Sequence, residues 1–152
     1  MKVLALDPGG TTGWAWMNSE LVSDVKFNCG QLEGTNHHSE LWALLELAET
    51  SHDFTIVCER FEYRNRSRAG LELISRDYIG VTTLFSQQRH VKLVMQTAAM
   101  AKGFVQDRHI KKLGLWSPGN PHAMDGYRHL LYYVIHNTNG RERTALLEKG
   151  WK

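Results

Sequence analysis

Apolar residues recur along the chain with two spacings, one typical of strands and the other typical of helices. Short apolar or alternating runs predict five strands, at residues 1–7, 12–17, 25–32, 54–61 and 91–95. The fourth run holds the unbroken apolar stretch Ile56-Val57-Cys58, which is typical of a strand covered on both faces. We therefore expect this strand at the centre of the sheet.

Apolar residues three and four positions apart predict helices at 37–51, 69–88, 97–103, 107–113 and 122–136. Pro121 favours a helix start at this point, because proline is well tolerated in the first turn of a helix. The end of the chain is charged, and we expect roughly 141–152 to form a frayed tail.

The order of these elements is three strands, a helix, a strand, a long helix, a strand and further helices. The short polar connections between the first three strands favour an antiparallel meander. This order predicts an α/β protein with an RNase H-like fold, in which a mixed five-stranded sheet has helices on both faces. A length of 152 residues without an internal repeat or a linker indicates a single compact domain, 1–152, which with this fold would be an RNase H-like nuclease domain.

The composition, 42% apolar and 22% charged, is ordinary for a globular protein. A net charge of +2 is only mildly basic, so a nucleic-acid surface would depend on local clustering of positive side chains. Cys29 and Cys58 lie in apolar strand-like runs without metal-type spacing, and we interpret them as buried thiols. Neither a signal peptide nor an apolar stretch of about 20 residues is visible, so we expect a cytoplasmic protein without membrane association.

Two acidic residues end predicted strands. Asp7 ends the first strand and precedes a glycine-rich turn, where a carboxylate leaves room for a metal ion and a phosphate. The same motif is compatible with a tight turn, or with the phosphate-binding hairpin of actin-like ATPases. Glu59 follows the central apolar run, where an ionised carboxylate is costly to bury unless it is paired or binds a metal. A pair with Arg60 is the alternative, although neighbours on a strand point to opposite faces.

A third candidate is the pair His122 and Asp125 at the start of the last long helix. Residues three apart lie on one face of a helix, about 4.5 Å apart along its axis, so both can reach one ion. In a sheet of this order the ends of the first and central strands and the start of this helix converge. Clustered carboxylate oxygens suit Mg²⁺ or Mn²⁺, and two such ions about 4 Å apart would serve phosphodiester hydrolysis.

These segments resemble the RuvC family of Holliday-junction resolvases. Leu4-Ala5-Leu6-Asp7-Pro8-Gly9 resembles the opening of these enzymes, and Cys58-Glu59-Arg60-Phe61 resembles their glutamate-containing strand. Val94-Met95-Gln96-Thr97 and Lys102 resemble their Lys-Gln-Thr segment and its following basic residue, and His122-Ala123-Met124-Asp125-Gly126 resembles their D-A-A-D-A motif. The resemblance implies a divergent, phage-type member that cuts branched DNA in recombination and repair, in the host cytoplasm if a phage encodes it. It also implies four catalytic metal ligands, Asp7, Glu59, His122 and Asp125.

Basic and aromatic side chains follow Glu59 closely and suit contact with a phosphate backbone. We expect the DNA-binding residues to be Arg60, Phe61, Tyr63, Arg64, Arg66, Arg68, Lys102, Lys111 and Lys112. A solvated loop with scattered arginines is the alternative. The family resemblance places an aromatic wedge three residues after the glutamate. Here Glu62 occupies that position, which leaves Tyr63 as the candidate.

The helix at 69–88 corresponds by resemblance to the dimer helix of RuvC, and a homodimer matches the two equivalent strands of a four-way junction. The remaining histidines, His129 among them, lack a consistent ligand spacing, and we interpret them as surface or packing residues. Two other functions stay open: a broader nuclease for flaps and forks, and an idle DNA-binding module. A nucleotide cofactor is not expected, because a second phosphate-binding glycine-rich motif is missing.

Overall fold

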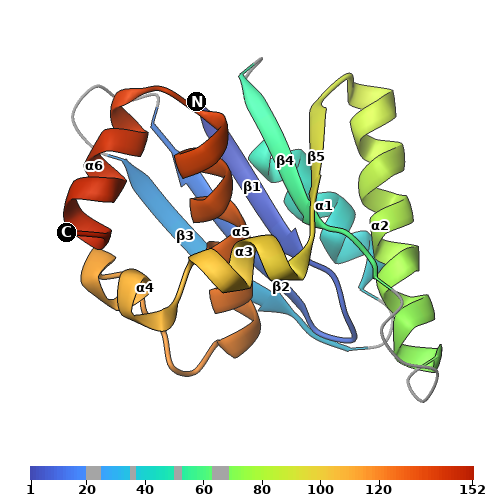
Figure 1. The fold of residues 1–152 in the computed structure, drawn as a ribbon. Coiled ribbons are helices and arrows are strands. Elements are labelled where there is room, and N and C mark those ends of the chain that lie inside the picture. Colours follow the sequence, from blue (N-terminus) through green and yellow to red (C-terminus); the bar gives the residue numbers. More distant parts are fainter. Residues whose placement is uncertain (20–24, 35–36, 50–52, 63–68) are drawn as a thin grey trace.

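The computed structural model describes residues 1–19, 25–34, 37–49, 53–62 and 69–152, and the side chains of 69–73 are not described. A five-stranded sheet forms the middle layer, with helices on both of its faces (Figure 1). The strands are β1 (Lys2–Asp7), β2 (Thr12–Asn18), β3 (Lys26–Leu32), β4 (Phe54–Glu59) and β5 (Lys92–Gln96). The helices are α1 (His38–Ala48), α2 (Ala69–Arg89), α3 (Ala98–Phe104), α4 (Asp107–Leu113), α5 (Pro121–Asn137) and α6 (Arg141–Gly150).

The strands lie in the order β3-β2-β1-β4-β5. The first three form the expected antiparallel meander, whereas β4 runs parallel to both β1 and β5. The carboxyl ends of β1, β4 and β5 therefore meet at one edge of the sheet. The order, the mixed sheet and the central position of the first and fourth strands confirm the fold expected from the sequence.

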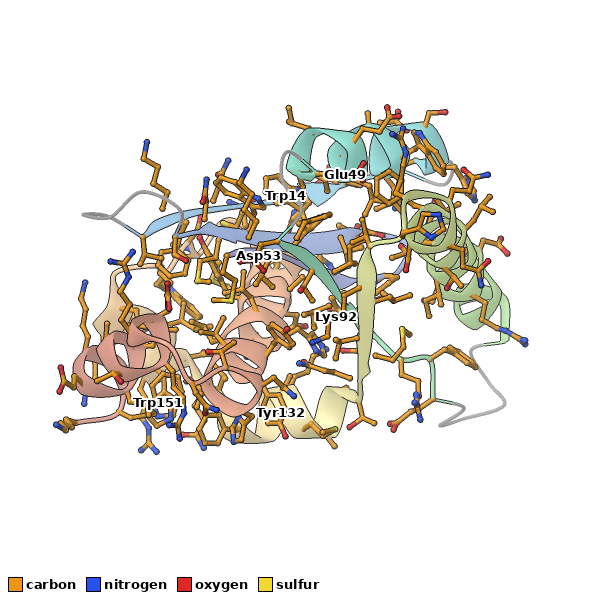
Figure 2. The ribbon with its side chains drawn as sticks, turned by 90° about the horizontal axis from the view of Figure 1, so that it is seen from above. Trp14, Glu49, Asp53, Lys92, Tyr132 and Trp151 are labelled. Atoms are coloured by element: carbon orange, nitrogen blue, oxygen red, sulfur yellow. The ribbon has the colours of Figure 1, made fainter. Side chains whose placement is uncertain are left out.

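Each face of the sheet has its own apolar core. Strand alternation directs Val3, Ala5 and Val57 to the face that α5 covers, together with α3, α4 and α6. Leu4 and Ile56 point to the opposite face, where α1 and α2 pack. Figure 2 shows these two helical layers above and below the sheet.

The end of the chain differs from the frayed tail expected from its charge. Residues Arg141–Gly150 form α6, and Leu146 on this helix is only 6% exposed. The ring of Trp151 stacks on Phe104 of α3 and on His109 of α4. Leu146, Leu147 and Trp151 thus anchor a segment in which most of the charged residues face solvent. The helices of the described chain include none that is long and apolar enough to cross a membrane.

Candidate active site

Three polar side chains reach the same corner of the sheet because of strand alternation. Asp7 continues the face of Val3 and Ala5 on β1, and Glu59 continues the face of Val57 on β4. Gln96 ends β5 and pairs in register with Glu59. Each of the three is the last residue of its strand, so the backbone beyond them leaves the sheet and opens the corner.

Helix α5 crosses this corner and adds three more side chains. Asp125, Arg128 and His129 occupy positions three and four apart, so they lie on the helix face that meets the sheet. Arg128 donates hydrogen bonds to Asp125 and to Asp107 at the start of α4. These bonds fix the Asp125 carboxylate and tie α4 to the site.

Lys102 of α3 places an ammonium group among three carboxylates. Its Nζ lies 3.6 Å from Asp7 Oδ2, 3.2 Å from Glu59 Oε2 and 3.0 Å from Asp125 Oδ2. The structure thus brings together three of the four acidic or imidazole ligands predicted from the sequence, around one cation. A cation is therefore electrostatically favoured at the point where the carboxylates converge.

The carboxylates have unequal affinities for protons. Burial raises the pKa of Asp7, and the neighbouring Glu59 and Asp125 raise it further, to about 8, although Lys102 opposes them. Burial would also raise the pKa of Glu59, but a hydrogen bond with His129 and the charge of Lys102 lower it to about 2. Burial lowers the pKa of Lys102, yet the three carboxylates raise it more, so it exceeds the ordinary lysine value. Asp7 therefore retains a proton near neutral pH, chiefly because its carboxyl group is buried beside two other carboxylates.

His129 lies within the same cluster, although its position inside an apolar helix predicts a surface or packing residue. Its side chain is fully buried, and its Nε2 lies 2.8 Å from Glu59 Oε2. Ligand atoms of Asp7, Glu59 and His129 lie within 4.8 Å of one another, a grouping that could hold a metal ion. The signal available in the sequence was its spacing of four residues after Asp125, which puts both on one helix face.

His122 lies in a different setting. It is exposed at the start of α5, and its backbone N–H donates to Gln31 Oε1 at 3.0 Å. The group of close ligand atoms among the described residues consists of Asp7, Glu59 and His129, and it contains neither His122 nor Asp125. The role of His122 as a metal ligand stays a prediction.

The expected DNA-binding residues are partly described. Arg60 and Phe61 line a hollow of about 220 Å³ together with Pro8, Glu59 and Lys102. Tyr63, Arg64, Arg66 and Arg68 lie outside the described residues. Lys111 and Lys112 are exposed on α4, the helix whose first residue pairs with Arg128. A basic helix thus starts beside the acidic cluster.

The chain is similar to solved structures of Holliday-junction resolvases. RuvC from Thermus thermophilus is 17% identical, with a TM-score of 0.65 over 90% of this chain and 95% of that one. The same enzyme in complex with a Holliday junction substrate is 16% identical, with a TM-score of 0.68 over 90% and 94% of the two chains. The fowlpox virus resolvase is 14% identical, with a TM-score of 0.58 over 91% and 100%.

Comparisons by sequence give no match, either to models of protein families or to curated proteins. At such low identity the likeness to the solved resolvases concerns the path of the backbone. It extends over nine-tenths of this chain. The chain therefore has the RNase H-like fold found in RuvC and other Holliday-junction resolvases.

Proposed function

We propose that this chain is a metal-dependent endonuclease that cuts branched DNA, including Holliday junctions, by hydrolysis of a phosphodiester bond. The observation that carries the proposal is the convergence of Asp7, Glu59 and Asp125 on one cationic group, Lys102. They meet where strand ends open the sheet, on a backbone shared with enzymes that act on four-way junctions.

The donor set fits a divalent cation. The Lys102 ammonium lies where an ion would sit. Burial, together with Glu59 and Asp125, raises the pKa of Asp7, and a divalent cation bound there would favour its ionised form. Carboxylate oxygens are the ligands that Mg²⁺ prefers, and an imidazole would shift the preference toward Mn²⁺. Asp7, Glu59, Asp125 and, by resemblance, His122 would hold two such ions. Bound there, the ions would polarise the phosphate and activate water for attack.

The remaining residues of the site would bind and orient the DNA. Arrival of a divalent ion would free Lys102 from the carboxylates, and its ammonium group could then contact the phosphate backbone. Arg60 and Phe61 lie at the same hollow as Glu59, where a strand of DNA could pass. Tyr63, Arg64, Arg66, Arg68, Lys111 and Lys112 would extend the contact surface.

A homodimer would suit this function, because two active sites related by a two-fold axis match two equivalent strands of a junction. We place the interface on α2, by analogy with the RuvC family. Leu84 is a large apolar side chain on this helix that is 49% exposed, which is compatible with such a contact. Light scattering coupled to size-exclusion chromatography would measure the mass of the particle and test whether the chain forms a dimer.

A cleavage panel tests the function. The purified chain would be incubated with a four-way junction, a flap, a fork and linear duplex, each with Mg²⁺ or Mn²⁺, beside Asp7→Asn. We expect the junction to be cut in the presence of metal, and Asp7→Asn to abolish cutting. Equal rates on flaps, forks and junctions would instead favour a broader nuclease. Binding of junctions without any cleavage would leave only a DNA-binding module.

A further inference from the structure

We infer that Gln96 and His129 form a buried relay that orients the Glu59 carboxylate for cation binding, with His129 acting through a hydrogen bond and not as a metal ligand. This inference rests on the proposed metal-dependent function. It assigns a positioning role to two residues beyond the four expected ligands.

Both nitrogens of the His129 ring have a hydrogen-bond partner. Nε2 lies 2.8 Å from Glu59 Oε2, and Nδ1 lies 3.0 Å from Gln96 Oε1. His129 is completely buried and Gln96 is 2% exposed, so water does not compete for these hydrogen bonds. The ring therefore cannot rotate without breaking two buried polar contacts, and it holds Glu59 in one orientation.

The far end of the relay is fixed by the backbone of the sheet. Gln96 pairs in register with Glu59 across β4 and β5, and its carbonyl oxygen accepts a hydrogen bond from Arg60 N. His129 comes from α5, the helix that also supplies Asp125. The relay consequently ties two strands and one helix together at the point where the proposed ligands meet.

The placement of protons indicates why His129 would not bind the metal itself. Gln96 Nε2 is buried and has no hydrogen-bond partner among the described residues. Exchanging the oxygen and nitrogen of this amide would let Nε2 of Gln96 donate to Nδ1 of a neutral ring. That ring then carries its proton on Nε2, facing Glu59.

The other amide orientation leads to the same result at Glu59. With Oε1 facing the ring, Nδ1 of His129 donates to Gln96, and the 2.8 Å contact with Glu59 Oε2 is then a hydrogen bond from Nε2–H of a ring that carries both protons. In both arrangements the proton on Nε2 occupies the lone-pair direction that a metal would need. Outer partners of this kind typically change metal affinity 10- to 100-fold.

The experiment measures Mn²⁺ affinity of the DNA-free protein by calorimetry, for wild type, His129→Leu, His129→Gln and Gln96→Leu. His136→Leu, on the same helix but exposed, is the matched control. We expect His129→Leu to weaken binding about 10- to 100-fold and Gln96→Leu to weaken it less. His129→Gln, which retains an N–H near the position of Nε2, should recover most of the affinity, and the control should match wild type.

Electron spin-echo modulation of bound Mn²⁺, in protein labelled with ¹⁵N-histidine, separates a positioning role from direct ligation. We expect the ¹⁵N coupling to be the same in wild type and His129→Gln. Loss of a ¹⁵N coupling to Mn²⁺ in His129→Gln would identify His129 as a metal ligand and overturn the inference. Unchanged affinity in Gln96→Leu would overturn it as well, even if His129→Leu fails to fold. If wild type binds no Mn²⁺ and cuts no DNA, the proposed function itself fails. If wild type binds Mn²⁺ and cuts DNA while the His129 and Gln96 variants match it in both, the positioning role of these two residues fails and the proposed function stands.

Discussion

Gly13 of β2 lies directly against the carbonyl group of His122 at the start of α5. A Cβ atom on Gly13 would come within 1.9 Å of the His122 carbonyl oxygen, closer than any real contact. A second glycine, Gly126, meets the backbone of Trp14, where a Cβ would come within 2.7 Å of the carbonyl carbon. These two glycines let α5 approach the sheet closely enough for Asp125 to reach the carboxylates of β1 and β4.

Replacing Gly13 by alanine should therefore push α5 away from β2. Overpacking of this kind typically costs about 1–3 kcal/mol, and the displacement should also weaken Mn²⁺ binding. Urea unfolding and metal titration measure the two effects. Gly103→Ala is the matched control, since a Cβ there meets nothing within 4 Å and alanine favours the helix. Equal stability of Gly13→Ala and wild type would show that the contact does not set the position of α5.

Leu146→Ala tests whether α6 is an integral part of the fold. Leu146 is 6% exposed within the core beneath α5, and truncation of such a leucine typically costs about 2–5 kcal/mol. Leu47→Ala in α1 is the same substitution at a side chain that is 77% exposed, and it should change the free energy of unfolding far less. Thermal unfolding of both variants decides the point. Similar melting temperatures for the two would support a loosely attached α6.

Asp7→Asn should stabilise the metal-free protein at alkaline pH. The pKa of Asp7 is raised from 3.8 to about 8, so the folded state holds a proton that the unfolded state releases. Stability from this group is full below the unfolded pKa and is lost as the pH rises toward 8. An asparagine mimics the protonated acid, so its advantage should grow between pH 5 and pH 8.5 and reach at least about 1 kcal/mol.

Melting temperatures across this pH range, without metal, measure the effect of Asp7→Asn. Added Mn²⁺ serves as the internal control, because the ion should raise the melting temperature of wild type more than that of the variant. A variant that is less stable than wild type at pH 8.5 would contradict the raised pKa of Asp7.

Much of the fold follows from the apolar pattern, because β1, β2 and β4 carry fully buried apolar side chains. The unbroken run before Glu59 marks β4 as central, and the central position of β4 is confirmed by its pairing with β1 and β5. The pattern fails at α6, where half of the residues are charged and the core contacts are made by Leu146 and Leu147 and by Trp151 just after the helix. Such sparse anchoring gives too little periodicity to distinguish a packed helix from a tail.

The candidate site follows from the sequence to the extent that it lies at strand ends. Asp7 and Glu59 are predicted because each carboxylate closes an apolar strand, and Asp125 because it opens the last long helix; the structure places all three around Lys102. His129 was not identified, since a histidine inside an apolar helix looks like a packing residue. Only the pairing of β5 with β4 reveals that Gln96 and Glu59 lie on either side of its ring.

Lys102→Met should tighten Mn²⁺ binding while slowing DNA cleavage. In wild type an arriving ion must displace the ammonium group from Asp7, Glu59 and Asp125, at distances of 3.0 to 3.6 Å. Lys102 is 36% exposed, so solvent screens these pairs, and their combined loss is on the order of 1 kcal/mol, or about fivefold in affinity.

The same substitution removes a positive charge that would otherwise contact the phosphate backbone, so the cleavage rate should fall although the metal binds more tightly. Calorimetry of the DNA-free protein and single-turnover cleavage measure the two effects separately. Lys149→Met, on the exposed face of α6, should alter neither value. Weaker metal binding in Lys102→Met would mean that the lysine organises the carboxylates for the ion and does not compete with it.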